Sequence, residues 1–361
     1  MFAACRIVYN KAIELLSNGF AGSNYDLRDR IKTLDLPQWV KDTPEHPKEY
    51  AIANAFDAYF RAKKDGGRAK FKSCREPSQT VQFHQRNYKN GCWFPSITKQ
   101  FNFDSSEDIP LDCDYSTQIT FNRKRWFACF PAKEETIQTA SNKVIALDPG
   151  VRTFLTGFDG EKVLEFGKGD IGRIYRMCSH LDKLTQKISQ SKVRKQKRKL
   201  SKAAQRLRNK IRDLVDECHK QVANYLTREY KIIFLPVFET SQMVVKKGRK
   251  LHSKTARQML TWSHYRFKQF LKYKAQSRGC AVVECNESYT SKTCTNCGHK
   301  HKSLGGNHHF KCPNCGMRIN RDWNGARNIM LRALRDGSLF IFSIEMDIAI
   351  AFDTVVQYFS A

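Results

Sequence analysis

Four cysteines near the C-terminal end of the chain are spaced C-x2-C-x14-C-x2-C, and they are Cys294, Cys297, Cys312 and Cys315. Each C-x2-C pair can turn tightly enough to present two thiolates to one metal ion, and Gly298 and Gly316 supply a permissive backbone directly after the pairs. Four thiolates close the coordination shell of Zn²⁺, whereas a catalytic zinc keeps an open position. The spacing therefore predicts a structural zinc ribbon, with a redox pair or a chance spacing as the alternative.

Other potential metal ligands lie near these cysteines or elsewhere in the chain. The loop between the two pairs contains His299, His301, His308 and His309. With four cysteines already present, we expect these histidines to be surface or nucleic-acid contacts. The other nine of the 13 cysteines are scattered singly, which favours small buried thiols over disulfides in a reducing compartment.

The chain carries a large positive charge, because 63 Lys and Arg against 35 Asp and Glu give its 361 residues a formal net charge of +28. This excess is far beyond what solubility needs and indicates a polyanionic partner, most simply nucleic acid. A membrane surface is the alternative, but the sequence has no run of about 18 apolar residues. The first residues lack the charged n-region and smooth apolar core of a signal peptide, which indicates an intracellular protein.

The spacing of apolar residues predicts an α+β fold. Residues 1–64 have helical spacing, and about 66–132 contain short segments rich in Phe, Trp, Ile and Thr that are typical of antiparallel strands. After a polar linker, residues 143–160 (KVIALDPGVRTFLTGFDG) predict two strands joined by a Pro-Gly turn, with Asp148 at the end of the first strand. A long helical region follows over about 171–230.

Within that helical region, Lys183–Arg212 holds 13 Lys or Arg and no acid. An exposed helix normally mixes charges of both signs, so this segment repels itself and forgoes i,i+4 ion pairs. A phosphate backbone would offset the repulsion, which predicts a nucleic-acid-binding surface. A nuclear-import signal or a solvated helix face is the alternative. The expected contact residues are Lys192, Arg194, Lys195, Lys197, Arg198, Lys199, Lys202 and Arg206.

Two carboxylates occupy positions typical of catalytic acids. Asp148 ends an apolar strand, and functional groups of open sheets collect at such ends. Asp322 lies in NRDWNGARNIMLRAL, where it precedes a helical pattern and, taken alone, is equally well explained as a helix N-cap. Two or three carboxylates on separate elements can hold two Mg²⁺ ions roughly 4 Å apart and activate water for attack on a phosphodiester.

Together these segments resemble a known family. ALDPGVRTFLTGFDG, the basic helix, YTSKTCTNCG and NRDWNGARNI are similar to the split RuvC-type nuclease core and zinc ribbon of the TnpB transposon-encoded nucleases and of their eukaryotic and viral relatives, the Fanzor proteins. The type V CRISPR nucleases are more distant kin. The resemblance covers about 141–334 strongly, and it covers the N-terminal ACRIVYN and RWFACF segments more loosely.

The resemblance implies an RNase H-like (RuvC) core with an inserted four-cysteine zinc ribbon, a helical recognition part and a β-barrel-like wedge. The implied division is 1–65 (helical recognition-like region), 66–140 (β-rich wedge-like region), 141–290 (RuvC-like core with basic helices), 291–317 (zinc ribbon), 318–335 (last RuvC segment) and 336–361 (tail).

The resemblance also implies RNA-guided cleavage of double-stranded DNA that depends on Mg²⁺. The partners would be a guide RNA and a target DNA with a short flanking motif, since base pairing reads the sequence while the protein holds the shape of the heteroduplex. No membrane and no obligate protein partner is expected. In a eukaryotic or viral host the protein would act in the nucleus, and otherwise in the bacterial cytoplasm or nucleoid.

The chain departs from the family pattern in two places. Relatives begin with a β-strand before the helix that carries CRIVYN, so here either the gene start is misplaced or the wedge is reduced. Relatives also carry a Glu in the segment equivalent to FLPVFETSQMV. Aligning Met243 with the Met of the family puts Pro236 in the place of that Glu, and Glu239 falls on a position commonly held by Asn.

The third catalytic acid is therefore open between Glu287 and Glu239, with Glu287 favoured. Some Fanzor-type relatives lack the usual Glu and carry one shortly before TSKTC, as ESYTSKTC does here. Glu287 lies seven residues before Cys294, and Asp322 lies seven residues after Cys315, so a shared zinc ion should bring the two acids toward each other.

The other nearby acids are weaker candidates. Glu239 follows Pro236, which cannot donate to a sheet ladder and predicts an early strand end or a bulge, so Glu239 is expected in a solvated loop. Glu284 sits within the predicted strand AVVEC, on the face opposite Val283.

These observations predict an RNA-guided DNA endonuclease with Asp148, Glu287 and Asp322 as catalytic acids, which hydrolyses phosphodiester bonds with Mg²⁺. A catalytically degenerate relative that only binds RNA or DNA is one alternative. A guide-independent RNase H-like nuclease is the other.

Overall fold

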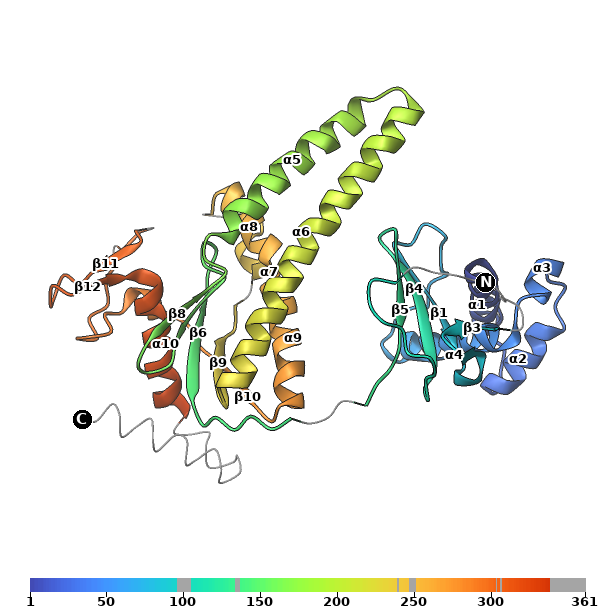
Figure 1. Ribbon diagram of the computed structural model, residues 1–361, viewed down its shortest axis with the longest axis horizontal. Coiled ribbons are helices and arrows are strands. Elements are labelled where there is room, and N and C mark those ends of the chain that lie inside the picture. Colours follow the sequence, from blue (N-terminus) through green and yellow to red (C-terminus); the bar gives the residue numbers. More distant parts are fainter. Residues whose placement is uncertain are drawn as a thin grey trace. The chain divides into compact units, whose positions relative to one another are not determined.

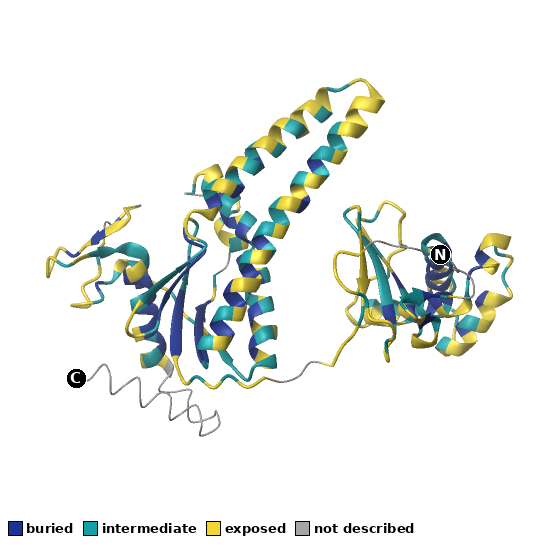
Figure 2. Cartoon of the chain, viewed as in Figure 1, coloured by how far each residue is buried: buried dark blue, intermediate teal, exposed yellow. Residues whose placement is uncertain are grey.

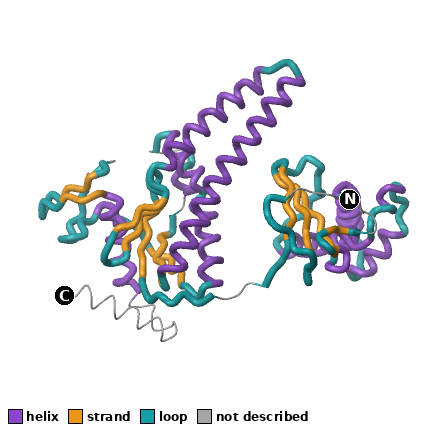
Figure 3. Tube along the Cα trace, viewed as in Figure 1, coloured by secondary structure: helices purple, strands orange, loops and turns teal. Residues whose placement is uncertain are grey.

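The computed structural model divides the chain into two compact units, Met1–Lys133 and Glu134–Ala361 (Figure 1). The residues that it describes are 1–95, 105–133, 137–238, 240–246, 251–302, 304–305 and 307–337. Both units combine helices with sheets, so the fold is α+β, as the sequence predicts (Figure 3). Within the described residues, no helix is both long and apolar enough to cross a lipid bilayer.

The N-terminal unit is built on four helices. They are α1 (Phe2–Ser17), α2 (Asn24–Lys32), α3 (Gln38–Lys41) and α4 (Glu45–Lys64). The buried residues of α1 follow helical spacing, and they form one stripe in the core that α1 shares with α4; they are Ala4, Cys5, Val8, Tyr9, Ala12, Ile13 and Leu16. The chain enters α2 through a capping box between Ser23 and Asp26.

Short strands complete this unit. They are β1 (Ser78–Phe83), β2 (Tyr88–Lys89), β3 (Cys92–Trp93), β4 (Thr117–Asn122) and β5 (Arg125–Cys129), with a 3-10 turn η1 (Gln85–Asn87). The strands β1, β4 and β5 form an antiparallel sheet in the order β1-β4-β5, and β2 pairs with β3. The aromatic residues of the predicted β-rich segment supply its core, where Tyr88, Trp93 and Phe130 pack together.

The C-terminal unit is built on a five-stranded mixed sheet in the order β10-β9-β6-β7-β8. Its strands are β6 (Val144–Pro149), β7 (Leu155–Phe158), β8 (Val163–Phe166), β9 (Ile232–Pro236) and β10 (Ala281–Cys285). The first three are joined as antiparallel hairpins, whereas β9 runs parallel to both β6 and β10. The carboxyl ends of β6, β9 and β10 therefore lie at one edge of the sheet.

Helices cover both faces of this sheet. They are α5 (Asp170–Gln190), α6 (Arg194–Glu229), α7 (Thr240–Met243), α8 (Ser253–Trp262), α9 (His264–Ser277) and α10 (Arg321–Gly337). Figure 1 shows α10 on one side of the sheet and α6 and α9 on the other. Two separate core clusters, one on each face, reflect this arrangement.

Alternation along β6 decides which side chains reach which face. Val144 and Ala146 pack in the cluster that includes α10. Ile145 and Leu147 pack in the cluster that includes α5, α6 and α9. Because successive side chains of a strand point to opposite faces, Asp148 falls on the α10 face.

The long helical region predicted over 171–230 is a helical hairpin. The chain breaks between α5 and α6 at residues 191–193, and α6 continues for 36 residues back to the sheet. Figure 2 shows that the far part of the hairpin extends beyond the sheet and is mostly exposed, while its near part is buried against the sheet. The buried residues of α6 concentrate in its second half, at positions such as Val215, Val222, Ala223 and Leu226.

The residues between β10 and α10 form a small ribbon. It consists of a 3-10 turn η2 (Thr290–Lys292) and the antiparallel strands β11 (His309–Lys311) and β12 (Arg318–Asn320). Its own core is small, with Cys294, Leu304, Phe310 and Cys312 as the buried members. A metal ion is therefore the natural source of additional stability for this segment.

Two neutral histidines lie in the core beneath β6. His219 and His264 both stack on Phe154, and their Nε2 atoms lie 2.8 Å from Trp262 O and 3.1 Å from Gly150 O. Burial lowers the pKa of each imidazole to about 4, from an ordinary value of 6.5. The core is therefore built around two uncharged rings.

We expect the two buried histidines to destabilise the C-terminal unit as the pH decreases from about 6.5 toward about 4, while the raised pKa values of Asp148 and Glu287 act in the opposite direction. In that window the unfolded chain protonates both histidines while the folded chain does not, so the free energy of unfolding decreases by on the order of 3 kcal/mol for each fully shifted histidine. The measurement is urea unfolding between pH 7.5 and 4.5. The variant His219→Gln should lose less stability on acidification than the wild-type protein, and an equal loss would contradict the prediction.

Candidate active site and zinc centre

Asp148 lies at the carboxyl end of β6, next to the first turn of α10. A Cβ atom built on Gly325 would lie 2.4 Å from Asp148 Oδ2, so the carboxylate rests directly against the backbone of the helix. Burial, followed by the negative charges of Asp322 and Glu287, raises the pKa of Asp148 well above its usual range. The Arg321 guanidinium acts in the opposite direction. The structure thus brings the three predicted acids into electrostatic contact.

Asp322 is the second residue of α10. Its backbone N–H donates to Asn320 Oδ1 at 2.8 Å, so the cap of this helix is the Asn320 side chain and not Asp322. The N-cap alternative for Asp322 is therefore wrong, and its carboxylate is not used for capping. A negative charge in the first helical turn is favourable because the free N–H groups and the helix dipole face it.

Glu287 follows β10 by two residues. Val283 and Cys285 of β10 pack against the core on the α10 face, and Glu287 continues the same alternation beyond the strand end. Its carbonyl oxygen accepts from both the backbone N–H and the Oγ1 of Thr290, at 3.1 and 2.8 Å, which closes a turn. Burial raises the pKa of Glu287 to about 7.

The two weaker candidates have different outcomes. Glu239 lies outside the described residues. Glu284 lies on the opposite face of β10, where its carboxylate accepts from Lys268 at 3.1 Å and from Lys272 at 2.5 Å, and these lysines lower its pKa. β9 ends at Pro236, as the sequence predicts. Glu284 is thus neutralised by α9 and is not part of the carboxylate cluster.

The carboxylate cluster has the chemistry of a divalent cation site. Three acids from β6, from the segment after β10 and from α10 are gathered on one face, and two of them have raised pKa values. A cluster of this kind is unfavourable when all its members are ionised, and hard cations such as Mg²⁺ would offset the repulsion through carboxylate oxygens. The donor set fits Mg²⁺ or Mn²⁺.

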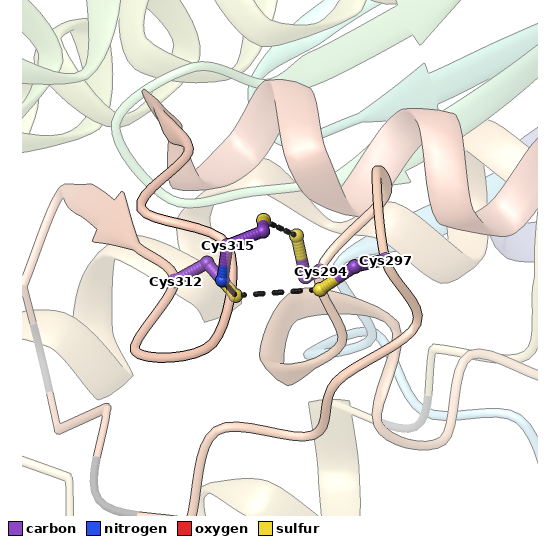
Figure 4. A group of neighbouring side chains, drawn as sticks. All are labelled: Cys294, Cys297, Cys312 and Cys315. Atoms are coloured by element: carbon purple, nitrogen blue, oxygen red, sulfur yellow. Dashed lines mark hydrogen bonds between the residues drawn. The ribbon is translucent and has the colours of Figure 1, made fainter.

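The four cysteines converge on one point (Figure 4). Their Sγ atoms all lie within 4.8 Å of one another, with Cys294 to Cys315 at 3.7 Å and Cys297 to Cys312 at 3.6 Å. A tetrahedron with Zn–S bonds of about 2.3 Å has S–S edges of about 3.8 Å, so the spacing fits a zinc ion. None of the 13 cysteines, all of which the structure describes, forms a disulfide. Of the nine scattered cysteines, only Cys5 and Cys178 are buried, so the expected burial is wrong for the other seven, of which Cys74 and Cys129 are exposed.

Local geometry prepares the thiolates for a metal. Gly298 and Gly316 have φ values of +71° and +74°, so each cysteine knuckle uses the left-handed conformation that the sequence analysis anticipated. The Asn314 side chain donates to Cys297 Sγ at 3.6 Å, and this contact contributes most to lowering the pKa of that thiol to about 6. The histidines of the intervening loop are absent from this described cluster of ligand atoms.

The eight predicted nucleic-acid contacts lie at the far end of the helical hairpin. Lys192 precedes α6 and the other seven, from Arg194 to Arg206, lie in its first half. All eight are exposed, and none forms an ion pair with another described residue. The charges therefore remain uncompensated by the parts of the chain that the structure describes.

Sequence reasoning missed three residues next to the acids. Arg321 donates to Gly305 O at 2.9 Å and lowers the pKa of Asp148, so it links the ribbon to the cluster. Asn324 and Asn328 of α10 bind the segment that follows Glu287. The sequence NRDWNGARN does place Asn324 and Asn328 four residues apart, on one face of the predicted helix. A helical pattern alone, however, does not show what these side chains bind.

Comparison with known proteins agrees with this geometry. Residues 264–329 match the family model described as Cas12f1-like, TNB domain, and residues 128–245 match the one described as a probable transposase. A TnpB-like protein of Acanthamoeba polyphaga mimivirus is 31% identical over 258 residues, which are 69% of this chain and 48% of that protein. This chain is thus similar to the TnpB proteins.

More distant similarities extend over most of this chain. The Escherichia coli protein named "Putative RNA-guided DNA endonuclease InsQ" is 26% identical over 91% of this chain and 86% of its own length. The protein of a solved Cas12f1-sgRNA-target DNA complex aligns with this chain at a TM-score of 0.53. The alignment covers 90% of this chain and 80% of that protein at 11% sequence identity, so it shows a likeness of fold. The chain spans less than half the length of the curated viral relatives that it matches.

The zinc centre generates a direct test. We expect metal analysis of the purified protein to find about one Zn²⁺ per chain, and we expect Cys312→Ser to lose the metal and to lower the melting temperature, because the ribbon has little core of its own. The control is Cys178→Ser, which removes a buried thiol of the same unit and should retain the zinc. A Cys312→Ser protein that keeps its zinc and its stability would contradict the assignment.

Proposed function

We propose that this chain is an RNA-guided DNA endonuclease that hydrolyses phosphodiester bonds of target DNA with Mg²⁺. The observation that carries the proposal is the carboxylate cluster of Asp148, Asp322 and Glu287 at the carboxyl edge of the sheet. Asp148 and Asp322 come from segments that the resemblance assigned to a RuvC-type site, and Glu287, after β10, would replace the usual Glu at the end of β9.

The fold supports the same proposal. Three antiparallel strands extended by two parallel strands, with an acid after the first strand and helices on both faces, match the RNase H-like core implied by the resemblance. The relatives named as RNA-guided DNA endonucleases align with most of the chain. We place guide RNA and double-stranded DNA as partners, and the nucleus as the site of action if the host is a eukaryote or its virus.

The residues of the cluster would act through their charge and position. Bound Mg²⁺ would supply the positive charge that lowers the pKa of a water nucleophile and stabilises the leaving oxygen. Asp148, Asp322 and Glu287 would provide the carboxylate oxygens that hold it. Arg321 lies close enough to Asp148 to favour its ionised form, which is the form that binds a cation.

The exposed Lys and Arg side chains of the helical hairpin would bind the RNA backbone. Each phosphate contact releases counterions, so affinity should decrease steeply with salt. This function needs no sequence-specific contact from the hairpin, in agreement with a protein in which base pairing reads the target.

The cluster assignment predicts that Glu287→Ala reduces Mg²⁺-dependent DNA cleavage by about 10²-fold or more while DNA binding is kept, because one charged positioning group is removed. The measurement is cleavage of a matched plasmid target by the protein purified with its RNA, whose sequence identifies the guide. Glu284→Ala is the matched control, since Glu284 lies on the opposite face of the sheet, and it should cleave like the wild type.

Glu239→Ala distinguishes the remaining assignments of the third acid. Full cleavage by this variant supports Glu287. A Glu239→Ala protein without cleavage activity, together with a fully active Glu287→Ala protein, would overturn the assignment of Glu287 as the third acid. Absence of Mg²⁺-dependent cleavage in the wild type would favour the degenerate nucleic-acid-binding relative, and cleavage without a bound discrete RNA would favour the guide-independent nuclease.

The hairpin predicts a uniform effect on RNA affinity. Changing Arg194, Lys195, Lys197 and Arg198 together to Gln should weaken binding to all RNA sequences and reduce the slope of log affinity against log salt by about 0.7 for each phosphate that the variant no longer neutralises. The measurement is fluorescence anisotropy at several salt concentrations. The control changes four exposed lysines of the N-terminal unit, which are Lys32, Lys41, Lys63 and Lys64. Unchanged binding after the hairpin substitutions would leave the hairpin as a solvated surface.

A further inference from the structure

Two buried asparagines of α10 bind the chain segment between Glu287 and the zinc ribbon. Asn324 and Asn328 are four residues apart, so their side chains lie one above the other on the same face of the helix. They are fully buried and nine-tenths buried respectively, with 0% and 8% exposure. Amides at such positions are unusual unless their hydrogen bonds are satisfied, and here the partners lie on one short segment.

The hydrogen bonds run from the helix to backbone atoms of residues 290–295. Asn328 Nδ2 donates to Thr290 O at 2.8 Å and to Thr293 O at 2.6 Å. Asn324 Nδ2 donates to Thr293 O at 2.7 Å, and Asn324 Oδ1 accepts from Thr295 N at 3.0 Å. Because every partner is a backbone group, the helix fixes the path of the segment and not only one side chain.

This path leads directly to Glu287. The Thr290 carbonyl is held by Asn328, while the Thr290 N–H and hydroxyl both donate to the carbonyl of Glu287. The turn between them places Tyr289 at a φ of +66°, a conformation that a bulky residue adopts only when its surroundings impose it. Asn328 is thus linked to the backbone of Glu287 through one residue, Thr290, which forms hydrogen bonds with both.

The same helix carries Asp322 and, through Gly325, contacts Asp148. The helix α10 therefore sets the position of all three acids. It contains Asp322, its backbone at Gly325 contacts Asp148, and its two asparagines hold the segment that follows Glu287. Displacing Glu287 relative to α10 would break hydrogen bonds that satisfy two buried amides, which is unfavourable.

We propose that Asn324 and Asn328 are positioning residues that hold Glu287 in register with Asp322 and Asp148, so that the three carboxylates can share divalent cations. This proposal rests on the proposed function of the cluster. It assigns to the two asparagines a role in metal affinity that is distinct from their contribution to stability. Residues that orient metal ligands typically change metal affinity by about 10- to 100-fold when they are removed.

The test is isothermal titration of Mn²⁺ into the full-length, zinc-loaded protein without RNA. Asn328→Ala and Asn324→Ala should each weaken Mn²⁺ binding by about 10-fold or more while the zinc content stays the same as in the wild type. The matched control is Asn209→Ala, because Asn209 is also 8% exposed, lies in the same unit and bonds Gln205 on α6, away from the cluster. Asn209→Ala should lower stability without changing Mn²⁺ affinity.

A double variant separates positioning from a general loosening of the fold. If Asn328 acts through Glu287, then Asn328→Ala should add no more than about a twofold loss of Mn²⁺ affinity in a Glu287→Gln background, since neighbouring sites that act as a unit are not additive. A further 10-fold loss in that background would overturn the proposal. Wild-type Mn²⁺ affinity in both single asparagine variants would overturn it as well.

Hydrogen exchange gives a second measurement that does not depend on metal. The amide of Thr295 donates to Asn324, so the peptide that contains it should exchange faster in Asn324→Ala than in the wild type. If either alanine variant fails to fold, Asn324→Asp keeps the volume and the acceptor oxygen while removing the donor to Thr293. It should keep the protection of Thr295 but still weaken Mn²⁺ binding, and wild-type Mn²⁺ affinity in this variant would contradict the proposal.

Failure of the proposal can be distinguished from failure of the proposed function. If the wild type binds no Mn²⁺, or binds it equally well in Asp148→Asn, then the cluster is not a cation site and the proposed function is wrong. If Mn²⁺ binding depends on Asp148 and Glu287 but not on Asn324 or Asn328, then the function stands and the positioning role is wrong.

Discussion

The contact between Asp148 and the backbone of α10 at Gly325 sets the geometry of the candidate active site. A side chain at Gly325 would collide with the carboxylate, so only glycine lets the helix approach β6 this closely. That approach brings Asp322 near Asp148, at a cost in charge repulsion. For Glu287 the cost is desolvation, because burial raises its pKa from 4.5 to about 7. The apolar core between the sheet and α10 stabilises the arrangement, and a bound cation would offset the remaining repulsion.

Local elements were predictable where a single period or motif determined them. The β6–β7 hairpin, the basic helices and the cysteine knuckles all follow from residues close in sequence, and the structure confirms them. Long-range relations were not predictable in this way. The order β10-β9-β6-β7-β8 depends on parallel pairs between strands far apart in sequence, and the break at residues 191–193 has no Gly or Pro to mark it.

The identity of the third acid shows how the face of a strand decides function. Glu284 and Glu287 are three residues apart, and both lie close to the carboxyl end of β10. The alternation of side chains along a strand places Glu284 opposite Val283, but the residues of the strand do not show which face carries α10 and which carries the lysines of α9. Once the two core clusters are known, Glu284 belongs to the side of Lys268 and Lys272, whereas Glu287 belongs to the side of Asp148. Glu239 lies outside the described residues.

Zinc alone cannot place Glu287 and Asp322 beside each other. The metal site brings Cys294 close to Cys315, but an arm of seven residues can extend to about 24 Å, so equal offsets from the cysteines permit many separations. The asparagines of α10 remove this freedom, because they bind the arm that contains Glu287 along its length. A zinc ion held by the four cysteines would join the two arms at the ribbon, whereas the two asparagines would fix their register at the other end. Without the metal, the hydrogen bonds of Asn324 and Asn328 would still link α10 to the arm that contains Glu287. Without the asparagines, the ribbon would stay folded but the acids would lose their alignment.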